Sequence, residues 1–103
     1  MSTAKLESQG NERYRVSGVL DAVTTPKLLD ESAAKFATES GVDIYVDLAD
    51  VTESDSSGLA LVIEWLRLAR QRGQRMNFAN LPKQLLALAR ISEVEELIQP
   101  GVA

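Results

Sequence analysis

The sequence predicts an α/β domain with a mixed sheet of four to five strands, and three observations lead to this prediction. The chain has 103 residues, which is enough for one domain over residues 1–103 and little else. Segments with the two-residue period of strands alternate with segments of helical period, an order typical of α/β folds with parallel strands. Near the start, the turn residues Gly10 and Asn11 separate two short strands, which predicts an antiparallel hairpin in the same sheet.

The first half of the chain is expected to contain three strands and one helix. The two hairpin strands cover residues 4–9 and 14–20. Thr25 and Pro26 then form a helix start, with Thr as the N-cap and Pro at the first helical position, and Gly41 follows the end of this helix. Residues 42–48 alternate apolar side chains with Asp and Tyr, which makes them the clearest strand of the sequence.

The second half is expected to contain a polar turn, one strand and three helices. The turn covers residues 50–57, and a long helix over residues 58–72 ends at Gly73. A strand over 75–79 and a helix over 83–90 come next. A capping box from Ser92 to Glu95 then predicts a last short helix that continues to Ile98.

The composition excludes most kinds of catalysis. The chain contains no His and no Cys, so it lacks the commonest general base, thiolate zinc ligands and cysteine nucleophiles. Asp47, Asp50 and Asp55 are the remaining candidates for a magnesium cluster, but their spacing along a strand end and a turn favours the capping of backbone groups. We therefore expect no catalytic residue, no metal site and no cofactor.

The charge and the hydropathy predict a cytoplasmic protein and argue against nucleic acid or a membrane as its main partner. The net charge of −4 disfavours nucleic acid and anionic lipid as main partners. The polar N-terminus does not have the pattern of a signal peptide. No apolar run reaches the length of roughly 20 residues that a membrane span needs, so direct membrane insertion is not expected.

The residues with the clearest functional potential lie where the strand over 42–48 leads into the long helix. Asp55, Ser56, Ser57 and Gly58 occupy the start of that helix, where unpaired N–H groups and the helix dipole favour oxygen atoms and negative charge. A serine hydroxyl at this position can cap the helix, and the same position would tolerate a phosphate. The residues alone favour capping over a phosphorylation switch.

The long helix has an apolar arc of roughly 220°, whereas packing on one sheet needs little more than about 100°. Leu61, Trp65 and Leu68 lie on the part of the arc that the sheet does not need. Two covers are possible for these side chains. One is the helix around residues 85–89, and the other is a partner protein, because aromatic and Arg side chains are typical of interfaces. We expect at least one of the three to be partly exposed.

Two motifs resemble those of the STAS domain family (sulfate transporter and anti-sigma factor antagonist). Residues 55–59 read Asp-Ser-Ser-Gly-Leu between a strand and a helix, and residues 17–21 read Ser-Gly-Val-Leu-Asp at the end of an early strand. The resemblance extends from about Tyr14 to Ile98. It implies a mixed sheet with helices mainly on one side, a function exerted through docking, no enzymatic activity and no cofactor.

Within the family the resemblance leaves two branches open, and Ser56 fits both. In anti-sigma factor antagonists, the residue at the position of Ser56 is phosphorylated by a partner kinase. In the other branch, a STAS subunit binds the cytoplasmic ATPase of the Mla-type phospholipid ABC transporter, which maintains outer-membrane lipid asymmetry. Residues 58–70 and 81–90 resemble the transporter branch, and antagonists more often have Gly at the position of Ala60. The resemblance thus favours a transporter subunit held at the inner membrane by its ATPase, with the antagonist as the alternative.

Overall fold

The structure is a computed structural model that describes residues 2–99, in which strands and helices alternate as the sequence predicts. The elements are β1 (Ala4–Gly10), β2 (Arg13–Leu20), α1 (Thr25–Phe36), β3 (Asp43–Ser54), α2 (Ser56–Gln71), β4 (Arg75–Ala79), α3 (Lys83–Ile91) and α4 (Glu95–Ile98). The prediction of an α/β fold is confirmed.

The four strands form one mixed sheet in the order β1-β2-β3-β4. β1 and β2 are antiparallel, whereas β3 runs parallel to both β2 and β4. The predicted hairpin is present, and its turn uses a left-handed backbone at Gly10, Asn11 and Glu12. β1 and β4 are therefore the two edges of the sheet.

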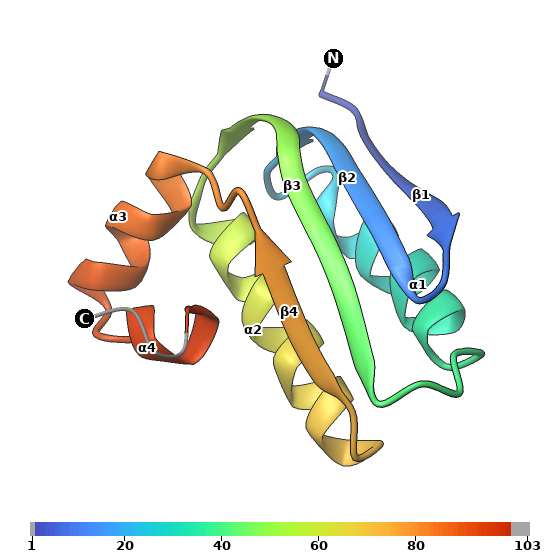
Figure 1. Cartoon of the computed structure of the whole chain (residues 1–103). Coiled ribbons are helices and arrows are strands. Elements are labelled where there is room, and N and C mark those ends of the chain that lie inside the picture. The colour runs from blue at the N-terminus through green and yellow to red at the C-terminus, as the bar shows by residue number, and fades with distance from the viewer. Residues whose placement is uncertain (1, 100–103) are drawn as a thin grey trace.

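The helices lie on one face of the sheet, and none of the described elements covers the other face. Figure 1 shows α1 and α2 side by side behind the sheet, with α3 and α4 next to the β4 edge. The core lies between the sheet and α1 and α2. It contains fully buried side chains from both layers, among them Val16, Leu20, Phe36, Ile44, Leu48, Val62 and Trp65.

β3 is longer than predicted, and the polar turn expected over residues 50–57 is largely absent. The strand continues to Ser54 because its second half pairs with the second half of β2. Two register shifts make this pairing possible, one between Asp47 and Asp50 and one between Val51 and Glu53. Such bulges let a strand carry extra residues without losing its partner, so Asp50, Thr52 and Glu53 stay exposed within the strand while Ser54 is buried.

The expected capping box at the last helix is not formed. Ser92 is the C-cap of α3, and Glu93 has a left-handed φ of 59°. Ser92 is therefore not the N-cap of α4. The N-cap of α4 is Val94, which makes no side-chain capping bond. Glu95 instead forms an ion pair with Arg90, with 2.6 Å between its Oε2 and the arginine Nε.

Candidate functional site

The start of α2 follows the end of β3 after a single residue, Asp55. This residue has an extended backbone and is the N-cap of the helix. Its Oδ1 accepts a hydrogen bond of 2.7 Å from the N–H of Ser57. Its own N–H donates to the carbonyl of Leu20 at 3.1 Å. The expectation that a serine hydroxyl caps the helix is wrong, because the longer β3 places Asp55 at the capping position.

Ser56 is the first residue of α2 and is exposed, while Ser57 is half-buried and Gly58 is buried. Ser56 thus lies on the protein surface. Within residues 2–99 the Ser56 hydroxyl makes no hydrogen bond to another group. Its role in partner binding or phosphorylation stays a prediction.

Gly58 lets the first turn of α2 approach the ends of β2 and β3. A Cβ at this position would lie 2.0 Å from the Oγ of Ser54 and 3.1 Å from the Cβ of Leu20. Such distances are far below van der Waals contact, so any larger residue must displace the helix start. Gly58 thus has a packing role beneath the exposed residues Asp55 and Ser56.

Ser54 and Gln84 complete the support of the helix start and were not predicted from the sequence. The N–H of Ser54 donates a hydrogen bond of 3.1 Å to the Oε1 of Gln84 on α3. The Ser54 hydroxyl donates to the carbonyl of Asp55 at 3.3 Å. Because Gln84 lies 30 residues further along the chain, no local pattern could have indicated its contact with β3.

Asp21 forms the turn between β2 and α1. Its Oδ1 accepts hydrogen bonds from the N–H groups of Val23 at 2.9 Å and Thr24 at 3.1 Å. Hydrogen bonds from the Ser2 hydroxyl and from the Thr24 N–H hold the pKa of Asp21 below its ordinary value. The turn leaves the side chain of Val23 73% exposed, an apolar group on the surface close to the start of α1.

An apolar groove of about 510 Å³ lies between the starts of α1 and α2. It is lined by Ala22, Thr25, Pro26, Leu29, Ser57, Ala60, Leu61 and Glu64. A second, smaller depression of about 280 Å³ contains the acidic residues Asp21, Glu53 and Asp55, and no Lys or Arg is among its lining residues. Because Asp55 lines the depression and Ser57 lines the groove, Ser56 stands between an acidic surface and an apolar one.

The wide apolar arc of α2 is covered by both α1 and α3. Trp65 is fully buried and Leu61 is 3% exposed. The indole of Trp65 packs edge-on against Phe36 of α1, with 5.8 Å between the ring centroids. Leu61 and Trp65 are therefore not free to contact a partner, and the expectation that at least one of the three side chains is partly exposed is met by Leu68 alone. Leu68, in contrast, is only half-buried.

The three carboxylates considered for a magnesium cluster, those of Asp47, Asp50 and Asp55, each interact with different groups of the protein. The Oδ1 of Asp47 accepts hydrogen bonds from the Asn80 side chain at 3.0 Å and the Ala49 N–H at 2.9 Å, and these lower its pKa. Asp50 lies 3.6 Å from Arg15, and Asp55 caps α2. Within residues 2–99 no group of three acidic residues is arranged to hold a metal ion.

Comparison with known proteins decides the family. A family model described as "Mlab, STAS domain" matches residues 5–99. The chain belongs to the STAS family. An anti-sigma-B factor antagonist of Listeria monocytogenes is 29% identical over 84 residues, which are 82% of this chain and 73% of the relative. The antagonist of the same name from Bacillus subtilis is 25% identical over 92 residues, 89% of this chain and 83% of the relative.

A solved structure confirms the STAS fold. The anti-sigma factor antagonist SpoIIAA in its unphosphorylated form superposes with a TM-score of 0.72 at 17% identity, covering 93% of this chain and 85% of that one. The described part of this STAS domain contains no helix of the length and apolarity needed to cross a bilayer.

Proposed function

We propose that this STAS domain is an anti-sigma factor antagonist whose binding to a partner protein is controlled by phosphorylation of Ser56. The proposal rests on the different roles of Asp55 and Ser56 at the start of α2. Asp55 caps the helix, with 2.7 Å between its Oδ1 and the Ser57 nitrogen, so the exposed Ser56 hydroxyl has no structural task. A phosphoryl group can therefore be attached without the loss of a capping bond.

The charges around Ser56 determine what such a modification does. A phosphoserine carries a charge of about −1.5 to −2 at neutral pH. The helix N-terminus favours this charge, but the neighbouring carboxylates of Asp21, Glu53 and Asp55 repel it. With no lysine or arginine among the residues of the acidic depression, the phosphoryl group is directed toward solvent, where it changes the surface that a partner meets.

The docking surface combines the exposed Ser56 with the apolar groove between α1 and α2. Pro26, Leu29 and Ala60 supply the apolar part of this groove, and the exposed Val23 follows Ala22, another of its lining residues. Apolar centres with polar rims are the usual composition of protein interfaces. The names of the two sequence relatives, both anti-sigma-B factor antagonists, further support a protein partner of the anti-sigma factor class.

The test measures phosphorylation and partner binding together. The protein is isolated from its own host by affinity capture, as the wild type and as the Ser56→Ala and Ser57→Ala variants. We expect intact-mass spectrometry to find one phosphoryl group on the wild type and on Ser57→Ala, and none on Ser56→Ala. We also expect Ser56→Glu to remain folded and to recover much less anti-sigma factor than the wild type. Absence of the modification under all growth conditions, with an anti-sigma factor absent from the captured proteins, would contradict the proposal.

A second candidate function is the accessory subunit of an Mla-type ABC transporter, bound to its cytoplasmic ATPase. The description of the matching family model and the Ala at position 60, where antagonists more often have Gly, favour this candidate. The same capture experiment separates the two, because a transporter ATPase recovered in equimolar amount without an anti-sigma factor supports the transporter role. In both candidates the STAS domain acts by docking and not by catalysis.

A further inference from the structure

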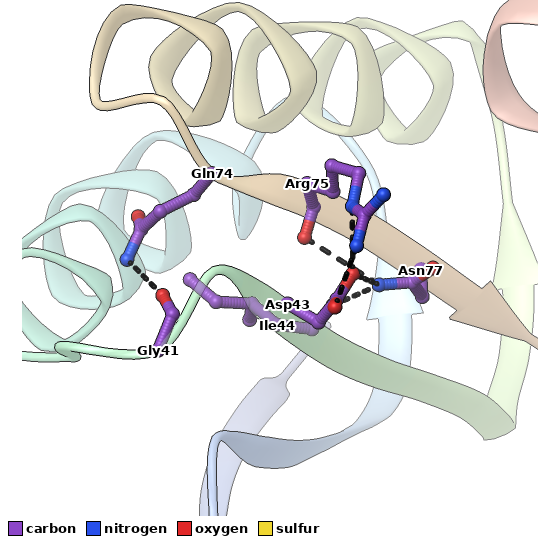
Figure 2. Close-up of polar contacts among 6 residues, drawn as sticks. All are labelled: Gly41, Asp43, Ile44, Gln74, Arg75 and Asn77. Atoms are coloured by element: carbon purple, nitrogen blue, oxygen red, sulfur yellow. Dashed lines mark hydrogen bonds and ion pairs between the residues drawn. The ribbon is translucent and has the colours of Figure 1, made fainter.

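The two edges of the sheet differ in how their charged side chains are paired. At one edge, β4 lies beside a cleft of about 950 Å³ between α2, α4 and the starts of β3 and β4. Figure 2 shows that the charge on this strand is already neutralised, because the Arg75 guanidinium donates hydrogen bonds of 3.0 and 2.9 Å to the carboxylate of Asp43. At the other edge, Lys5 and Glu7 of β1 make no ion pair with another residue of the described chain. Unpaired charges are therefore a property of the β1 edge.

The side of β1 that faces away from β2 has no neighbouring strand. β1 is the first strand of the sheet and pairs only with β2. Figure 1 shows that α1 lies in the layer behind the sheet and that no other strand lies beside β1. The seven residues of β1 contain no Pro, a residue that cannot donate to a ladder. An edge strand of this kind presents main-chain N–H and C=O groups that can pair with another chain.

The hydrogen bonds between β1 and β2 determine which residues face the free side. The N–H of Val19 donates to the carbonyl of Thr3 at 2.8 Å, and the register is regular from Ala4 to Ser8. In an antiparallel ladder, residues that bond to the neighbouring strand alternate with residues that do not, so the odd-numbered residues of β1 bond to β2. The N–H and C=O groups of Ala4, Leu6 and Ser8 therefore point to the free side.

The side chains of β1 alternate between the two faces of the sheet. Leu6 is 4% exposed and belongs to the core on the helix side, so Lys5 and Glu7 lie on the open face, where both are exposed. Arg15, which lies opposite Glu7 on β2, is paired with Asp50 instead. Lys5 and Glu7 are thus two unpaired, opposite charges on the same face of an edge strand.

A second copy of β1 matches this edge in one antiparallel register. Residues that point to the free side must lie opposite each other. With Leu6 opposite Leu6 of the second copy, Lys5 of each copy lies opposite Glu7 of the other. A shift in one direction places Lys5 opposite Lys5, and a shift in the other places Glu7 opposite Glu7. Because like charges directly opposite each other are unfavourable, the charges select the register centred on Leu6.

We propose that two copies of this domain join through β1 as a symmetric dimer, in which the two sheets are continuous across a two-fold axis at Leu6. Each main-chain bond on one side of the axis has a counterpart on the other. The interface adds main-chain bonds and ion pairs but few apolar side chains, so we expect a reversible dimer with a Kd of about 10–100 µM. The inference does not depend on Ser56 and goes beyond the proposed antagonist function, since the dimer carries two copies of the docking surface.

The test measures the oligomeric state of the whole chain by sedimentation equilibrium between about 5 and about 500 µM. We expect the wild type to change from monomer to dimer over this range. Lys5→Glu brings like charges together on both sides of the axis and is expected to weaken the dimer at least about tenfold. The exchange variant Lys5→Glu, Glu7→Lys makes the facing charges opposite again and should restore the Kd to within about threefold of the wild type.

Two further variants test the main-chain pairing and the location. Ser8→Pro removes an N–H that points to the free side and leaves the bonds to β2 in place, so we expect a monomer with the circular dichroism spectrum of the wild type. Lys83→Glu makes the same change of charge as Lys5→Glu on the exposed surface of α3, which Figure 1 shows at the opposite edge of the sheet. It should change the Kd less than about twofold.

Three results would overturn the proposal. The first is a wild type that stays monomeric at about 500 µM. The second is a dimer that Lys5→Glu and Ser8→Pro leave unchanged, since it would use another surface. The third is an exchange variant that is folded and as weakly associated as Lys5→Glu, because Lys5 and Glu7 would then not face each other in the dimer.

Discussion

The indole N–H of Trp65 donates a hydrogen bond of 2.7 Å to the hydroxyl of Ser32. The hydroxyl in turn donates to the carbonyl of Leu29 at 3.0 Å. Both Trp65 and Ser32 are fully buried, and they lie on different helices, α2 and α1. The pair therefore satisfies the one polar atom of the tryptophan inside the core and fixes how the two helices lie against each other.

Ser32→Ala is expected to destabilise the fold by about 1–3 kcal/mol, because it leaves the buried indole N–H without an acceptor. Urea denaturation of the purified domain measures this loss. Glu31→Ala, at the neighbouring exposed position of α1, is the control and should change the unfolding free energy by less than about 0.5 kcal/mol. Equal effects of the two changes would show that the hydrogen bond contributes nothing.

Gly58→Ala is expected to destabilise the domain by about 1–3 kcal/mol, since the added methyl group would lie 2.0 Å from the Oγ of Ser54. Thermal unfolding of the variant measures the effect. The double variant Gly58→Ala, Ser54→Ala removes the clashing hydroxyl and should recover most of the lost stability. No recovery would mean that the contact with Leu20, at 3.1 Å, dominates instead.

Asp55→Ala is expected to cost about 0.5–2 kcal/mol, the usual loss for an N-cap, because Asp55 accepts the Ser57 N–H. Ser56→Ala should cost less than about 0.5 kcal/mol, since the exposed hydroxyl has no partner among the described residues. Chemical denaturation of both variants compares the two. If Ser56→Ala is the more destabilising change, Ser56 is part of the helix cap, and the proposal that Asp55 caps the helix without the Ser56 hydroxyl is wrong.

The stability of the domain is expected to fall at alkaline pH through Tyr14. Burial and the hydrogen bond of 2.7 Å from the Tyr14 hydroxyl to Glu39 Oε1 raise the pKa of this phenol above its ordinary value. A pKa that is higher in the folded state gives stability that is complete below the unfolded value of about 10. That stability is lost as the pH rises above it.

The Tyr14→Phe variant isolates this contribution. Denaturation curves between about pH 8 and about pH 11 should show a steeper loss of stability for the wild type than for Tyr14→Phe, because only the wild type has this phenol, which ionises more readily in the unfolded chain than in the folded one. Tyr45→Phe, which removes an exposed tyrosine on β3, serves as the control. Parallel curves for the wild type and Tyr14→Phe would show that the phenol titrates alike in the folded and unfolded chain.

The purified domain is expected to turn over no nucleotide, because it has neither His nor Cys and no acidic cluster in its described part that could hold Mg²⁺. A phosphate-release assay with ATP, run beside the Ser56→Ala variant, measures this. Hydrolysis by the wild type above that of the variant would place catalysis at Ser56 and contradict a docking role.

The predictions from the sequence succeeded where a local pattern determines the structure. β4 was predicted at residues 75–79 and is found there, because Gly73 and Asn80 on either side have left-handed backbones that end the neighbouring segments. The predictions failed where the structure depends on pairing between distant segments. The end of β3 is set by bulges against β2, which the alternation of apolar and polar residues does not reveal.

The candidate site was predicted in its position but not in its details. The motif located the helix start, yet whether Asp55 or a serine caps it depends on the length of β3. The apolar arc of α2 was predicted correctly, but a helical wheel cannot say which element covers it. Ser32, which receives the Trp65 hydrogen bond, lies 33 residues away. The cleft between α2, α4 and the starts of β3 and β4 takes its lining from four elements and had no signal in the sequence.

The junction of β3 and α2 through Asp55 alone has a consequence for the kinetics of recognition. Because the Asp55 N–H is bonded to Leu20 and its carboxylate to Ser57, the backbone beside Ser56 does not need to be ordered when a partner arrives. Binding of a preorganised surface loses little conformational entropy, so association should be fast and nearly insensitive to substitutions at Ser56. Changes at this residue, including a phosphoryl group, should then act mainly on the lifetime of the complex.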